Sequence, residues 1–226
     1  MTPFVSSLYV ASSFLKIFDP AWMEQFLRDI SPWQYVVLFA IIFAESGLLI
    51  GMFLPGDSLL FVAGFLAFKG DLNIWILLPL MFIAAFTGDQ AGYTIGKLSG
   101  ERFFKNENAR ILKKSHVDKT KIFFDKHGSK TIVIARFVPI VRTLAPVMAG
   151  TAKMQYKKFV SFNVIGAFLW AIGITLLGYF LGQSIGAETI DKYLLPIIAL
   201  VVLLSLSPAI FEWIMHRRKS KVDIKN

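Results

Sequence analysis

Four ionisable side chains stand inside long apolar stretches of this sequence, and these are the residues best suited to chemistry. Glu45 and Asp57 lie in one stretch, and Arg136 and Arg142 lie in another. A charge at the middle of a bilayer costs about 2.5–3.5 kcal/mol on insertion scales, so chains seldom carry four without a use for them. The net charge of two acids and two bases is zero, so the four side chains can neutralise one another if the fold brings the two stretches together. The pattern predicts a polar site buried in a membrane protein.

The two acids have a structural and a functional interpretation. Burial favours the neutral form of a carboxyl group, and an opposing guanidinium favours the charged form. That competition can bring proton uptake and release within reach of physiological pH, so we expect Glu45 and Asp57 to couple a transport step to protons. The structural alternative is that they snorkel to an interface or only pair with a base.

The two arginines also have two interpretations, which are compatible. Arg136 and Arg142 could serve only as counter-ions for the acids, or they could bind an anionic head group, because a guanidinium matches phosphate oxygens at two points. We expect the second, with a phosphate replacing an acid partner. Asp89 is a weaker candidate for the site, because a role at a helix end is nearly as good an interpretation.

The composition favours one membrane-embedded domain. Of the 226 residues, 55% are hydrophobic and 15% aromatic, and the mean hydropathy is +0.60. The net charge of +9 is better explained by basic cytoplasmic loops and anionic lipid than by nucleic acid. The chain has no cysteine and three scattered histidines, so we expect no metal site. It also lacks a nucleophile motif and an ATP-binding GxxxxGK[ST] loop, so we expect neither an enzyme nor a cofactor.

The apolar and basic stretches alternate along the chain and suggest its organisation. Residues 1–32 include an amphipathic helix from Asp19-Pro20, expected to lie in the membrane interface. The membrane domain covers 33–215, with a first unit over 33–100, a basic loop over 97–130, a second unit over 131–186 and a last span over 193–215. A polar triplet, Gly88-Asp89-Gln90, interrupts the span over 72–96. Residues 216–226 form a basic tail.

Charge decides the expected topology, because cytoplasmic loops are rich in lysine and arginine. The loop over 97–130 carries ten basic and four acidic residues, and the connector over 151–158 and the tail are also basic. Residues 131–150 should therefore start and finish on the cytoplasmic side. Folded in half, these residues reach only about 15 Å, close to the bilayer midplane. We expect a re-entrant hairpin that breaks near Pro139, and a cytoplasmic C-terminus.

A repeat with an offset of 86 residues links the two halves. Gly92-Tyr93-x-x-Gly96-x-x-x-Gly100 recurs as Gly178-Tyr179-x-x-Gly182-x-x-x-Gly186, and Ala63-Gly64 recurs as Ala149-Gly150. Small residues at every fourth position allow close helix packing. Each half combines a proline-broken hairpin with one span, so the second half should enter from the opposite face. We therefore expect an all-α inverted repeat with two re-entrant hairpins, the design by which secondary transporters build midplane sites. The first hairpin breaks at Pro55-Gly56-Asp57, although residues 33–53 are long enough to span.

Several of these motifs resemble the DedA family, part of the group described as SNARE-associated or VTT-domain membrane proteins. The likeness covers about 33–215 and rests on these segments: Phe43-Ala-Glu45-Ser-Gly-Leu, Phe53-Leu-Pro-Gly-Asp57-Ser-Leu-Leu-Phe-Val-Ala-Gly64, Gly88-Asp89, Ala135-Arg136-Phe-Val-Pro-Ile-Val-Arg142-Thr-Leu-Ala-Pro146 and Phe162-Asn-Val-Ile-Gly166. The resemblance implies a bacterial inner-membrane protein with two re-entrant hairpins, active in envelope homeostasis. It also implies that the functional residues are a pair of acids and a pair of arginines. By motif these are Glu45, Asp57, Arg136 and Arg142.

The residues and the resemblance together predict a proton-linked flippase for an anionic lipid head group. The expected partners are protons and a polyprenyl phosphate or phospholipid. Undecaprenyl phosphate is the first candidate, phosphatidylethanolamine is the next, and a homo-oligomer is left open. One alternative is a proton-coupled exporter of small cations or drugs, with the acids binding substrate. Another is a membrane scaffold that transports nothing, for which neutralising all four charges would leave function intact.

Overall fold

The computed structural model describes residues 20–48, 54–103, 130–136 and 139–185, and every regular element in these ranges is helical. The all-α prediction is confirmed for this part of the chain. The elements are α2 (Pro20–Asp29), α3 (Gln34–Gly47), α4 (Gly56–Lys69), α5 (Ile74–Phe103), α7 (Lys130–Ala135), α8 (Pro139–Thr151), α9 (Tyr156–Ala167), the π-helical turn η2 (Phe168–Ile172) and α10 (Gly173–Ile185). The predicted last span and basic tail lie outside the described residues.

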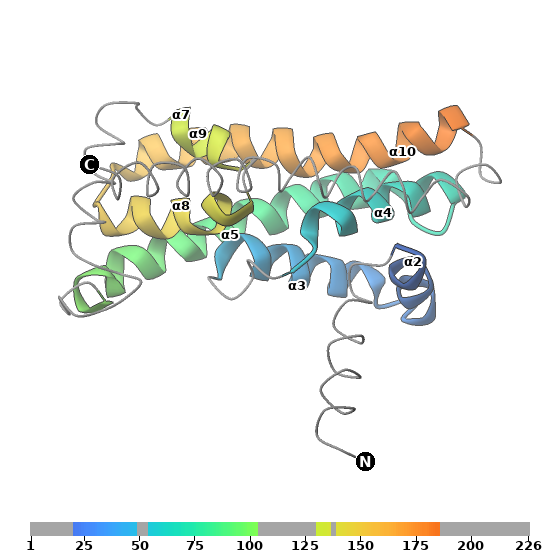
Figure 1. The fold of residues 1–226 in the computed structure, drawn as a ribbon, viewed down its shortest axis with the longest axis horizontal. Helices are drawn as coiled ribbons and strands as arrows, with labels where there is room; N and C mark the ends of the chain where they lie inside the picture. Colours follow the sequence, from blue (N-terminus) through green and yellow to red (C-terminus); the bar gives the residue numbers. More distant parts are fainter. Residues whose placement is uncertain (1–19, 49–53, 104–129, 137–138, 186–226) are drawn as a thin grey trace, which may run out of the picture.

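Within the described residues, two helical segments are long and apolar enough to cross a membrane. They are Ile74–Ser99 within α5 and Tyr156–Ser184, in which α9, η2 and α10 follow one another without a break. Their 26 and 29 residues span about 39 and 44 Å at 1.5 Å per residue. The hydrocarbon core is about 30 Å thick. Both helices run along the length of the molecule in Figure 1.

Of the other helices in the described ranges, four form two interrupted pairs, α3 with α4 and α7 with α8. Helix α3 has 14 residues, about 21 Å, which is too short to cross the core alone. The interruptions occur where the prolines predict them, because α4 begins directly after Pro55 and α8 begins at Pro139. The re-entrant paths themselves stay predictions, since residues 49–53 and 137–138 lie outside the described ranges.

One sequence-based expectation about α5 is wrong. Gly88-Asp89-Gln90 does not interrupt this helix, which continues to Phe103 and so replaces the first part of the loop predicted over 97–130. The triplet has a packing role instead. A Cβ on Gly88 would lie 2.6 Å from the carbonyl oxygen of Phe43 and 2.9 Å from Cβ of Ser46, so the glycine lets α3 cross α5 in close contact.

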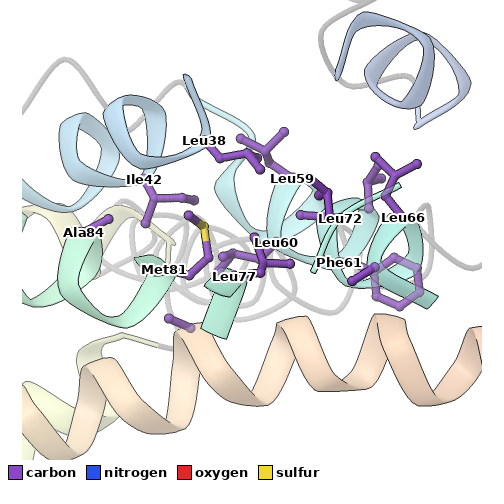
Figure 2. Close-up of a cluster of buried hydrophobic side chains, with 14 of the residues drawn as sticks. Leu38, Ile42, Leu59, Leu60, Phe61, Leu66, Leu72, Leu77, Met81 and Ala84 are labelled. Atoms are coloured by element: carbon purple, nitrogen blue, oxygen red, sulfur yellow. The ribbon is translucent and has the colours of Figure 1, made fainter. Parts of the chain in front are cut away.

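Helix α4 lies at the centre of the main hydrophobic core. A helix that is apolar on all sides is expected to be buried, and every residue from Ser58 to Ala67 is buried. Figure 2 shows its side chains among those of α3 and α5, and the labelled set is Leu38, Ile42, Leu59, Leu60, Phe61, Leu66, Leu72, Leu77, Met81 and Ala84. This core fixes the first turn of α4 against its neighbours.

The predicted N-terminal helix forms as α2 and packs on the far end of α4. Met23 and Leu27 are buried in the main core. Glu24 accepts a hydrogen bond from Lys69 Nζ at 2.9 Å, and Arg28 lies 2.8 Å from Asp71. Its position at a membrane interface stays a prediction, and Asp19 lies outside the described residues.

Among the repeated glycines whose surroundings the structure describes, Gly64, Gly178 and Gly182 lie where α4 meets α10, and Gly96 and Gly150 lie where α5 meets α8. A Cβ on Gly64 would collide with the carbonyl oxygen of Thr175, and a Cβ on Gly150 would collide with that of Tyr93. Gly64 and Gly150 are the residues that the 86-residue offset relates. The predicted packing role of these glycines is therefore confirmed. Insertion of the two halves from opposite membrane faces remains a prediction.

Candidate functional site

A buried cluster of charged side chains lies where the interrupted helices begin and end. Glu45 is in the last turn of α3, and Asp57 is in the first turn of α4. Arg136 follows the last residue of α7, and Arg142 is in the first turn of α8. The proline-determined interruptions therefore set the positions of all four residues that the sequence analysis selected.

Arg142 binds both acids of the interrupted pair α3 and α4. Its Nη1 donates a hydrogen bond to Asp57 Oδ1 at 2.7 Å, and its Nη2 donates to Glu45. These partners are 85 and 97 residues away in the chain. The side chains of Arg142 and Glu45 are 3% and 2% exposed, and that of Asp57 is 12% exposed. This arrangement is the expected convergence of distant charges.

Arg136 does not pair with Glu45 or Asp57, contrary to the expected pairing of two acids with two arginines. Its Nη2 donates to Asp89 and, at 2.7 Å, to Asn163 Oδ1. The suggested helix-end role for Asp89 is wrong, because this residue lies in the interior of α5 and is buried against Arg136. The structure therefore places a third acid in the cluster.

Trp170 connects the two arginines and was not anticipated from the sequence. Its Nε1 donates a hydrogen bond to Asp57 Oδ1 at 2.7 Å. Its ring centroid lies 4.3 Å from the guanidinium carbon of Arg142 and 5.7 Å from that of Arg136. A cation over an indole face is attracted by the ring quadrupole. A single tryptophan in an apolar stretch gives no signal of such a role. A π-helical turn such as η2, which carries Trp170, often marks a functional position.

Asn163 could have been found from the sequence, because it is a polar residue inside an apolar span. Its side-chain amide joins α9 to α5, since Nδ2 donates to the carbonyl oxygen of Phe86 at 3.2 Å. This bond orients the amide so that Oδ1 accepts from Arg136. We name the two halves of the cluster the Arg142 group (Arg142, Glu45, Asp57 and Trp170) and the Arg136 group (Arg136, Asp89 and Asn163).

Several buried polar atoms of the cluster have no hydrogen-bond partner among the described residues. They are Glu45 Oε2, Asp89 Oδ1, Arg136 Nε, Arg136 Nη1 and Arg142 Nε. Buried polar groups in proteins are normally paired, so each of these atoms has the capacity to bind a further polar partner. The three arginine nitrogens can therefore donate to an incoming anion before the existing ion pairs are broken, and the two carboxylate oxygens can accept a proton or another donor.

The charges of the cluster do not balance when every group is ionised. Three carboxylates face two guanidinium groups, and each carboxylate forms a direct ion pair with one of the two arginines. Burying an uncompensated charge is costly, so the excess favours the binding of a proton or a cation. In the parts of the chain that the structure describes, no group of three or more His, Cys, Asp or Glu side chains could hold a metal ion.

Comparison with known proteins places these residues in context. The family model described as VTT domain matches residues 54–180, which include every member of the cluster except Glu45. Protein DedA of Escherichia coli (strain K12) is 47% identical over 198 residues, 87% of this chain and 89% of that protein. An uncharacterized membrane protein of Mycobacterium leprae (strain TN) is 43% identical over 182 residues, 80% of each chain. Inner membrane protein YqjA of Escherichia coli (strain K12) is 36% identical over 174 residues, 75% of this chain and 79% of that protein. No solved structure gives a significant match.

Proposed function

Because the chain belongs to the DedA family of VTT-domain membrane proteins, we propose that it is a proton-linked flippase for an anionic lipid head group. The observation that carries this proposal is the burial of Arg142 between Glu45 and Asp57, at the meeting point of three helix ends. The first candidate substrate is undecaprenyl phosphate, and phosphatidylethanolamine is the second. The protein would lie in the bacterial inner membrane with its C-terminus in the cytoplasm.

The chemistry of the two arginines supports a phosphate substrate. A guanidinium donates in a planar fork that fits two phosphate oxygens, and a lysine ammonium does not. Arg136 and Arg142 both lie beside the ring of Trp170, so one head group could contact both. Helix ends surround the site, and a rocking motion of the interrupted helices would expose it to each side in turn.

Proton coupling follows from exchange of partners on Arg142. When a phosphate oxygen takes the donors of Arg142, Glu45 and Asp57 lose their counter-ion while they remain largely buried. An unpaired buried carboxylate favours protonation. Each exchange would thus take up protons on one side of the membrane and release them on the other.

Lipid translocation in proteoliposomes tests this proposal. Full-length protein is reconstituted with a fluorescent polyprenyl phosphate or a fluorescent phosphatidylethanolamine, and a membrane-impermeant reductant reports exchange between leaflets with and without a pH gradient. We expect a gradient-dependent rate for at least one lipid. Arg136→Lys should reduce it at least tenfold. Arg28→Lys, which alters a half-exposed arginine of α2, is the matched control and should leave it unchanged. Full activity of Arg136→Lys would argue against two-point phosphate recognition.

A second candidate function is proton-coupled export of small cations or drugs. The observation that favours it is the excess of three acids over two bases in the cluster, which suits a positively charged substrate. Efflux of a cationic dye from the same vesicles separates the two functions. Dye efflux without lipid exchange would favour the exporter.

A further inference from the structure

The two arginines of the cluster differ in how many of their donors are already bound. Arg142 uses both terminal nitrogens on acids, Nη1 on Asp57 and Nη2 on Glu45, so that only its Nε lacks a described partner. All of the side-chain bonds of Arg136 come from Nη2, and both Nε and Nη1 lack one. Nη2 is a member of both two-donor edges of the guanidinium, Nε with Nη2 and Nη1 with Nη2, so an anion that replaces Asp89 on Nη2 would find an unpartnered donor next to it on either edge.

The acid that holds Arg136 is also incompletely bound. Asp89 is 1% exposed, and it uses Oδ2 on Arg136 while Oδ1 has no described partner. Release of Arg136 from its carboxylate breaks one ion pair, whereas release of Arg142 breaks two. Arg136 also keeps a neutral partner in Asn163 throughout. Exchange of an acid for another anion is thus easier at Arg136.

The surroundings of Asp89 determine how its charge is compensated when it loses Arg136. The charged groups that face it are Arg136 after α7, Arg142 from α8, and, through Arg142, Glu45 from α3 and Asp57 from α4. The side of α9 that reaches it contributes the neutral Asn163. On α5 itself the nearest titratable residue is Tyr93, whose hydroxyl donates to the carbonyl oxygen of Met154 at 2.6 Å. No further cation in the described ranges pairs with Asp89, so a proton is the available substitute.

We propose that Arg136 is the first arginine to bind the lipid phosphate and that Asp89 is a third proton-carrying acid, replaced on Arg136 by the phosphate. This inference rests on the proposed function and adds a residue to it. A phosphoryl oxygen accepts hydrogen bonds from Arg136, the Asp89 carboxylate takes one proton from water, and the resulting acid stays in place. The only covalent change is the new O–H bond of Asp89, whose proton is given up by a hydronium ion of the solvent, and no bond between heavy atoms forms or breaks. The shared chemistry of the ligand is a phosphoryl group on an apolar tail, as a phosphomonoester or a phosphodiester.

Binding of short-chain lipids to the purified full-length protein in detergent tests the inference. Dioctanoyl phosphatidylglycerol carries one fixed charge between pH 5.5 and 8, so any pH dependence comes from the protein. Farnesyl phosphate is the phosphomonoester arm, and farnesol, which lacks the phosphate, is the negative control. Uptake of one proton on binding changes the affinity about tenfold per pH unit. We expect Asp89→Asn still to bind phosphatidylglycerol. Its affinity should change with pH less steeply than that of the wild-type protein, by a factor of about ten per pH unit. This difference does not depend on what Glu45 and Asp57 contribute, because both proteins contain them.

Asp71→Asn is the matched control, because Asp71 pairs with Arg28 at the far end of α4 and should keep the full pH dependence. A merely structural role of Asp89 predicts a lower melting temperature with an unchanged pH dependence, and that result overturns the inference.

If Asp89→Asn does not fold, Asn163→Asp replaces it. A second carboxylate on Arg136 should weaken binding at pH 8 at least tenfold, and unchanged binding would overturn the inference. If the wild-type protein binds neither phosphate lipid, the proposed function itself fails.

Discussion

The Arg142 group and the Arg136 group contain the same kind of ion pair, yet they connect different parts of the molecule. Their arginines are six residues apart in the chain. Arg142 joins α8 to α3 and α4, so it holds one interrupted pair of helices to the other. Arg136 joins the end of α7 to the two long helices through Asp89 and Asn163. The Arg142 group connects α8 to the interrupted pair α3 and α4, and the Arg136 group connects the end of α7 to the long helices.

This difference suggests separate tasks for two residues that look equivalent in the sequence. Movement of α8 away from α3 and α4 must break the Arg142 group, whose two ion pairs oppose it. The Arg136 group can exchange its single acid while Asn163 keeps the guanidinium in place. The side chain of Trp170 contacts both arginines, so a change in one group can be transmitted to the other through it.

The largest expected effect is that of removing the positive charge from each group in turn. Arg142→Met leaves two buried carboxylates unpaired, and Arg136→Met leaves one. Loss of one partner of a buried ion pair costs about 3–5 kcal/mol. We expect Arg142→Met to lower the free energy of unfolding more than Arg136→Met does, as measured by thermal unfolding in detergent. Equal losses would remove the distinction between the groups.

A smaller effect is expected from adding a methyl group beside Glu45, the partner of Arg142, or beside Arg136 itself. A Cβ on Gly56 would fall on the Glu45 carboxylate, whereas a Cβ on Gly166 would lie 2.8 Å from Cδ of Arg136, a flexible part of its side chain. Overpacking costs about 1–3 kcal/mol. The loss of stability should be near the upper limit of this range for Gly56→Ala and near the lower limit for Gly166→Ala. The melting temperatures of the two variants measure this, and the reverse order would contradict the packing.

Trp170→Phe tests whether the indole N–H or only the ring matters. Phenylalanine keeps an aromatic face for the arginines but removes the donor to Asp57 Oδ1. A lost hydrogen bond to a charged group costs about 1.5–3 kcal/mol. We expect that loss of stability, together with faster hydrogen exchange at the start of α4, where Asp57 lies, and little change near Asp89. Equal changes at both places would mean that the ring, not the N–H, dominates.

The smallest effect is expected outside both groups. Glu24→Gln weakens the ion pairs that Glu24 makes with the half-exposed Arg28 and with Lys69, whose side chain is partly buried but still reached by solvent. Such pairs contribute at most about 1 kcal/mol. Lipid translocation should be unchanged and the melting temperature only slightly lower. A loss of transport would show that the anchoring of α2 also controls the cluster.

Much of this arrangement could be predicted from local sequence features. Proline and glycine end or begin helices for steric reasons that do not depend on the rest of the fold, so Pro55 and Pro139 mark helix starts correctly. The cost of burying charge selects Glu45, Asp57, Arg136 and Arg142 with no structural information. The polar triplet at Gly88 gave the wrong expectation, because Gly88 is used for a helix crossing and Asp89 has a distant counter-ion.

By itself, the sequence determined that four charged groups are buried together, that helices begin at Pro55 and Pro139 and that the chain belongs in a membrane, because these depend on solvation and local backbone sterics. Only the tertiary structure decided which acid binds which arginine. The choice of Asp89 for Arg136, and of both Glu45 and Asp57 for Arg142, depends on how five helices approach one another. Coulomb attraction is not specific to a partner, so a charge pairs with whichever opposite charge the packing of the backbone brings nearest.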